Sequence, residues 1–136
     1  MCSSDLLVTF TDGFDAGTVR QIGADGQLRR LSGALPDGAL DQSLAVNRYL
    51  NGASQIAFDS AGNLLVAVRS GCVLARIAPD GRYVNIAGTG SFTPSALGDG
   101  GLATAASVCP AGVALNAAGE IFLADALNHQ IGRAHV

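Results

Sequence analysis

Apolar residues occur along the chain in short runs, and residues that favour turns close each run. In the central part of the chain, these runs predict four strands over residues 55–59, 64–68, 72–77 and 83–87. Residues 60–63, 69–71 and 79–81 are expected to form the turns between them, because they are rich in glycine, asparagine, serine and proline. The runs are almost continuously apolar, which is typical of strands buried on both faces.

The same pattern recurs along the chain at an interval close to 57 residues. Residues 53–67 align with residues 111–124 if one residue of slack is allowed, and Gly119 then stands 57 positions after Gly62. Upstream, residues 6–9 stand 58 positions before residues 64–67, and residues 24–26 stand 55 before residues 79–81. Repeats of short strands cannot bury their faces alone, so the sequence predicts stacked β-sheets.

The two ends of the chain do not follow the repeat. Residues 1–6 and 131–136 both reverse-translate into a common sequencing adapter or its reverse complement. We therefore interpret residues 1–6 and 130–136 as adapter-like, non-native segments and exclude them from the repeat. Residues 7–129 are then divided into a degenerate first repeat (7–52), a complete second repeat (53–109) and the first half of a third (110–129). This hypothesis predicts that the native reading frame continues beyond both ends.

The third repeat carries a family resemblance. Residues 110–116 and 119–125, followed by Asn128 and His129, resemble an NHL repeat, which is named after an Asn-His-Leu signature. Residues 98–104, Gly-Asp-Gly-Gly-Leu-Ala-Thr, resemble a loop of bacterial NHL propellers. The resemblance implies an all-β fold, a partial β-propeller of about two and a half four-stranded antiparallel blades. The first two repeats depart from the signature, with residues 12–17 and 68–72 at its place.

Antiparallel geometry assigns the longer loops to one face of this propeller. The turn after the second strand and the connection after the fourth return to the face on which the first strand starts. Loops on a rigid scaffold are where binding residues concentrate. The candidate ligand-binding residues of this face are Asp12, Arg69, Asp99, Asp125, Asn128 and His129.

Each candidate has a functional and a structural interpretation. Asp125, Asn128 and His129 could ligate a metal or act as acid and base, but a turn fixed by their hydrogen bonds is favoured. Asp99 lies in a glycine-rich segment that could cradle phosphate or calcium, although a crossover in which Asp99 caps a turn over residues 102–107 is favoured. Arg69 could contact an anionic ligand or be an exposed turn residue. We predict no catalytic residue, no metal site and no cofactor.

Composition excludes some classes of partner but does not assign a cellular compartment. The formal net charge of −3 argues against nucleic acid as a partner, and no apolar run is long enough to span a membrane. The resemblance is compatible with a secreted or periplasmic protein, but the sequence itself assigns no localisation. Cys72 and Cys109 lack the spacing of a zinc site or a disulfide framework, so we interpret them as small, part-buried apolar residues.

The favoured function is a non-catalytic scaffold or binding module for a protein, peptide or glycan on the loop face of the parent ring. One alternative is part of a propeller enzyme of the lactonase or peptidyl-lyase type, and another is the sensor domain of a membrane receptor. Because terminal sheets of a repeat array leave strand edges open, self-association through these edges is also expected.

Overall fold

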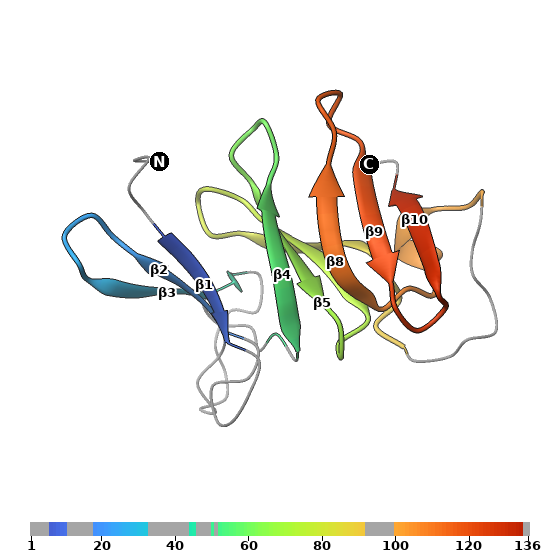
Figure 1. Ribbon diagram of the computed structural model, residues 1–136, viewed down its shortest axis with the longest axis horizontal. Helices are drawn as coiled ribbons and strands as arrows, with labels where there is room; N and C mark the ends of the chain where they lie inside the picture. Colours follow the sequence, from blue (N-terminus) through green and yellow to red (C-terminus); the bar gives the residue numbers. More distant parts are fainter. Residues whose placement is uncertain are drawn as a thin grey trace.

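The computed structural model describes residues 6–10, 18–32, 44–45, 50, 52–91 and 100–134. These residues form three antiparallel sheets that lie side by side (Figure 1). Sheet 1 contains β1 (Leu6–Phe10), β2 (Thr18–Ile22) and β3 (Leu28–Ser32). Sheet 2 contains β4 (Ala53–Phe58), β5 (Leu64–Val68), β6 (Val73–Ile77) and β7 (Tyr83–Ala87). Sheet 3 contains β8 (Pro110–Leu115), β9 (Ile121–Asp125) and β10 (Gln130–Ala134).

Sheet 2 confirms the four predicted strands of the second repeat. Its strands are paired in the order β4-β5-β6-β7, so each strand lies beside its neighbours in sequence. The hairpin between β4 and β5 is closed by Asp59, whose carboxylate oxygen Oδ1 accepts hydrogen bonds from the backbone N of Ala61 (3.0 Å) and of Asn63 (2.9 Å). Gly62 has a φ of 83°, a backbone conformation that glycine adopts without steric cost.

The β8–β9 hairpin of sheet 3 repeats this turn with different residues. Asn116 takes the place of Asp59, and its side-chain oxygen accepts hydrogen bonds from the backbone N of Ala118 (3.0 Å) and of Glu120 (2.9 Å). Gly119 has a φ of 80° and corresponds to Gly62. The predicted 57-residue repeat therefore extends to the hydrogen bonds of the turn.

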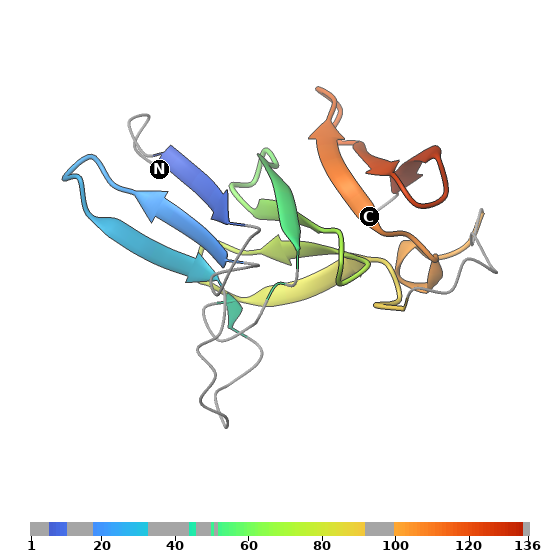
Figure 2. The ribbon, with the colours of Figure 1, turned by 60° about the horizontal axis from the view of Figure 1, so that its bottom comes forward.

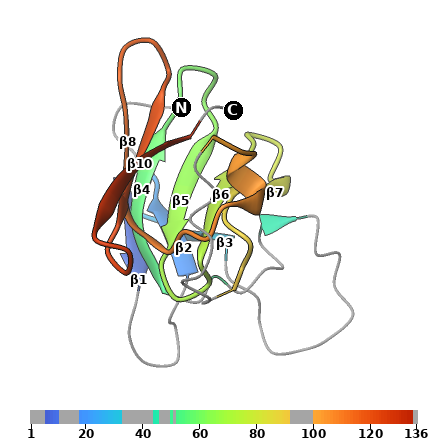
Figure 3. The same cartoon turned by 90° about the vertical axis from the view of Figure 1, so that its right-hand side faces the viewer.

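The side chains of sheet 2 alternate between two apolar layers. Leu64, Val66 and Val68 of β5 belong to the layer between sheets 1 and 2, whereas Leu65 and Ala67 belong to the layer between sheets 2 and 3. All five residues of β5 are buried, as expected for a strand covered on both faces. Figure 2 shows sheet 2 between the other two sheets, and Figure 3 shows β4 and β8 toward one side of the molecule and β7 toward the other.

Sheets 1 and 3 each correspond to three of the four strands of sheet 2. Gln21 pairs with Leu7 and Arg29, just as Arg76 pairs with Leu65 and Val84, so β1–β3 correspond to β5–β7. In sheet 3, β8–β10 correspond to β4–β6. The strand β10 lies in the segment interpreted as adapter-like, and its backbone pairs with β9 along its whole length.

Polar side chains connect the first strands of sheets 2 and 3. The side-chain oxygen of Gln55 accepts a hydrogen bond from the backbone N of Val113 (2.9 Å), and the Ser54 hydroxyl donates to the carbonyl of Ala111 (3.0 Å). Gly112 leaves the room that Gln55 needs, because a Cβ there would lie 2.7 Å from the Gln55 side-chain oxygen. The two sheets are thus fixed by hydrogen bonds as well as by apolar packing.

Candidate functional site

The structure brings several predicted site residues to one face of the molecule. This loop face contains the β5–β6 turn (residues 69–72), the described part of the connection to sheet 3 (residues 100–109) and the β9–β10 turn (residues 126–129). The connection includes the short 3-10 helix η3 (Ala103–Ala105) within the predicted turn over residues 102–107. The opposite side, the hairpin face, contains the β4–β5, β6–β7 and β8–β9 turns.

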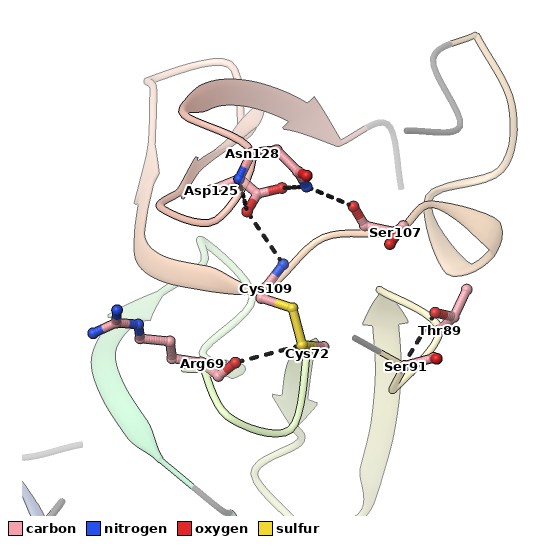
Figure 4. Close-up of a disulfide and its surroundings, with 8 residues drawn as sticks. All are labelled: Arg69, Cys72, Thr89, Ser91, Ser107, Cys109, Asp125 and Asn128. Carbon is pink, nitrogen blue, oxygen red and sulfur yellow. Dashed lines mark hydrogen bonds between the residues drawn. A yellow bond between two sulfur atoms is a disulfide. The ribbon is translucent and has the colours of Figure 1, made fainter. Parts of the chain in front are cut away.

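Asp125 is the centre of a hydrogen-bond network on the loop face (Figure 4). It is a buried carboxylate, 4% exposed. Its Oδ1 accepts hydrogen bonds from the backbone N of Cys109 and of Asn128 (both 3.4 Å), and its Oδ2 accepts one from the Asn128 side chain (2.6 Å). The Asn128 side chain also donates to the carbonyl of Ser107 (3.0 Å). Asp125 and Asn128 therefore make the hydrogen bonds that the structural interpretation predicted, because they fix the β9–β10 turn.

Cys72 and Cys109 form a disulfide, which corrects the interpretation of both as isolated apolar residues. The expectation was right about burial, since both side chains are almost fully buried, but wrong about bonding. The bond joins the β5–β6 turn of sheet 2 to the segment that enters sheet 3 (Figure 4). A signal was present in the sequence: antiparallel geometry assigns the turn beside Cys72 and the strand start after Cys109 to the same face.

Arg69 lies in the β5–β6 turn, where its backbone holds the turn and its side chain is exposed. Its backbone N donates to the carbonyl of Gly52 (2.9 Å), and its carbonyl accepts from the backbone N of Cys72 (3.3 Å). Figure 4 shows its guanidinium pointing away from the disulfide and from Asp125. Within the described part of the chain, this guanidinium has no ion-pair partner.

The remaining candidates are not joined to this network. His129 is exposed at the end of the β9–β10 turn, with a φ of 54°, and Cys72 occupies the corresponding place before β6 with a φ of 51°. Asp12 and Asp99 lie outside the described residues. Among the residues that are described, no three His, Cys, Asp or Glu side chains are grouped so that they could hold a metal, and no helix could cross a membrane.

Replacing Asp125 with alanine is expected to lower the free energy of unfolding by about 1 to 3 kcal/mol. The change leaves the buried backbone N of Cys109 without its hydrogen-bond acceptor and releases Asn128. Urea unfolding followed by far-UV circular dichroism measures the effect, with His129→Ala as the control at an exposed site of the same turn. An Asp125→Ala chain as stable as the His129→Ala chain would contradict the structural role.

Comparison with known proteins identifies the fold of the chain but assigns it to no family. The chain matches no model of a known protein family and no curated protein sequence. It is similar to the structure of a catalytically inactive variant of virginiamycin B lyase from Staphylococcus aureus with quinupristin, at 16% identity and a TM-score of 0.56, covering 93% of this chain and 36% of that one.

Two further solved structures come from Bacteroides. A protein of unknown function from Bacteroides thetaiotaomicron is 18% identical with a TM-score of 0.68, over 86% of this chain and 29% of that one. An auxiliary nutrient binding protein from Bacteroides ovatus is 18% identical with a TM-score of 0.62, over 87% of this chain and 32% of that one. The chain spans about a third of the length of these structures. Its three stacked antiparallel sheets are part of a β-propeller.

Proposed function

We propose that the chain is part of a bacterial propeller of the NHL type that binds a protein, peptide or glycan on its loop face without catalysing a reaction. The hydrogen bonding of Asp125 carries this proposal. Both oxygens of its carboxylate already accept hydrogen bonds from within the protein, and the side chain is buried. A general acid or base must reach the proton that it transfers. The buried, fully bonded carboxylate of Asp125 therefore favours a structural role in the loop face over a role in acid–base catalysis.

Among the described residues of the loop face, Arg69 carries the group that is best placed for a ligand. Its guanidinium is exposed, and a guanidinium binds carboxylates through two parallel hydrogen bonds. The disulfide beside the β5–β6 turn and the Gly52 hydrogen bond hold the backbone of Arg69 in place. A preorganised turn loses less conformational entropy when it binds. These observations support a ligand that presents a carboxylate, such as an acidic peptide or an acidic glycan.

Two probes test the proposal on the 136-residue chain: an acidic peptide with blocked ends, and an oligogalacturonate. We expect one of them to bind, and Arg69→Glu to weaken that binding at least tenfold. Arg82→Glu is the matched control, because Arg82 is an exposed arginine on the hairpin face. Equal binding by the Arg69→Glu chain would overturn the proposal.

The same samples distinguish binding from catalysis. Mass spectrometry after prolonged incubation is expected to recover each probe unchanged. A cleaved or eliminated product that disappears in the Arg69→Glu chain would favour the enzyme alternative over the binding module.

A further inference from the structure

A cleft recurs on the hairpin face at both junctions between sheets. The cleft between sheets 1 and 2 has a volume of about 470 Å³, and the cleft between sheets 2 and 3 has one of about 250 Å³. Both are lined by the last two strands of one sheet and by the first hairpin of the next. The end of β6 and the β6–β7 turn also line the larger cleft, whereas β5 and the β4–β5 turn also line the smaller one. Corresponding positions line both clefts, among them the pairs Gln21/Arg76, Leu31/Ile86 and Phe58/Leu115.

The cleft between sheets 2 and 3 differs from the other because it contains a cation. Arg76 of β6 is half-buried there, and its guanidinium makes no hydrogen bond or ion pair with any described residue. The corresponding residue of sheet 1 is the uncharged Gln21. In sheet 3 the corresponding Arg133 forms an ion pair with Glu120 (3.2 Å). Of these three equivalent positions, the one in sheet 2 thus presents a guanidinium to a cleft without an acid bonded to it.

Asp59 lies in the same cleft, but its carboxylate is bonded elsewhere. It accepts hydrogen bonds from the backbone of Ala61 and from the backbone and side chain of Asn63. Burial raises the pKa of Asp59, but these hydrogen bonds and the charge of Arg76 together bring the pKa below its ordinary value. Asp59 is therefore ionised at neutral pH and reduces the positive potential of the cleft without forming an ion pair with Arg76.

We propose that this cleft binds a small carboxylate with an apolar body. The guanidinium of Arg76 would hold the carboxylate, with the Ser60 hydroxyl at the same cleft as a further donor. The apolar body would lie between Ile86 of sheet 2 and Leu115 and Ile121 of sheet 3. The volume of about 250 Å³ suits a ligand smaller than a drug-sized molecule. This site is on the opposite face from Arg69 and does not depend on the proposed function.

Hexanoate is the probe, and hexanamide is its uncharged counterpart. Titration of the isotope-labelled chain, followed by nuclear magnetic resonance, is expected to shift the Arg76 side-chain Nε–H signal and the methyl signals of Leu115 and Ile121. The amide is expected to bind at least tenfold more weakly, because it cannot accept two charge-assisted hydrogen bonds.

Two variants taken from the protein's own repeats test the assignment. Arg76→Gln installs the residue of the equivalent position in sheet 1, and we expect it to weaken hexanoate binding at least tenfold. Asp59→Asn installs the equivalent of Asn116, which makes the same backbone hydrogen bonds, and we expect it to tighten binding severalfold by removing a negative charge. Arg29→Gln, at an exposed arginine of sheet 1 that lines neither cleft, should leave binding unchanged. Equal affinity of the Arg76→Gln chain, or shifts confined to another surface, would overturn the proposal.

Discussion

Removing the Cys72–Cys109 disulfide is expected to lower the free energy of unfolding by about 3 to 4 kcal/mol. The bond closes a loop between residues that are 37 positions apart, which restricts the unfolded chain. It also crosses the boundary between sheets 2 and 3, so its loss frees the segment that enters sheet 3. The double variant Cys72→Ala/Cys109→Ala, compared with the oxidised protein by urea unfolding, measures this difference. Far-UV circular dichroism is the suitable signal, because the chain has no tryptophan.

Reduction of the unchanged protein provides the matching control. In the presence of a thiol reductant, its unfolding midpoint should move to that of the double variant, whereas the double variant should not respond to the reductant. Both sulfurs are buried, so reduction is expected to be slow in the native protein and fast in urea. A native protein in which Cys72 and Cys109 both react with an alkylating reagent before any reduction would show that the disulfide does not form.

Truncating Leu74 to alanine is the second large change, with an expected loss of about 2 to 5 kcal/mol. Leu74 lies in β6, is 0% exposed and packs in the layer between sheets 2 and 3 with Val113 and Leu123. Alanine at this position leaves a cavity that the surrounding sheets can fill only in part. Urea unfolding of the two chains under oxidising conditions gives the difference.

Ile131 is a matched control for Leu74 within the same molecule. It occupies the equivalent position in β10, but it is 81% exposed. In a monomer, Ile131→Ala should change stability by less than about 0.5 kcal/mol. If a second copy of the chain covers the face of sheet 3 that carries Ile131, Ile131→Ala will instead destabilise the protein increasingly as its concentration rises. A Leu74→Ala chain no less stable than the Ile131→Ala chain would contradict the packing between sheets 2 and 3.

The sequence was most informative where local chemistry decides the structure. Strands of sheet 2 could be predicted within one or two residues because Gly62, Asn63 and the 79–81 segment end the apolar runs sharply. The repeat interval also predicted which strands of the three sheets are equivalent. The repeat interval could not predict the cleft at Arg76. The cleft is lined by residues of sheet 2 and of sheet 3, and its shape depends on how these two sheets pack.

The disulfide shows most clearly where sequence reasoning stopped. Neither Cys72 nor Cys109 belongs to a spacing pattern with a known pairing, and each is the sole cysteine of its surroundings. They meet because sheet 2 packs against sheet 3 and because the β5–β6 turn and the start of β8 lie on one face. The hydrogen bonds of Asp125, in contrast, could be predicted, since short polar side chains near turns commonly bond to the local backbone.

Because the three sheets have matching registers, equivalent residues can be exchanged between them in protein engineering. The same hairpin turn is held by two different side-chain pairs, Asp59 with Asn63 and Asn116 with Glu120. The negative charge lies on the first residue of one pair and on the last residue of the other. Exchanging them as intact pairs would move a charge along the rim of the molecule without designing a new turn. A library assembled only from such exchanges would vary the surface while every residue keeps a backbone environment in which it already occurs.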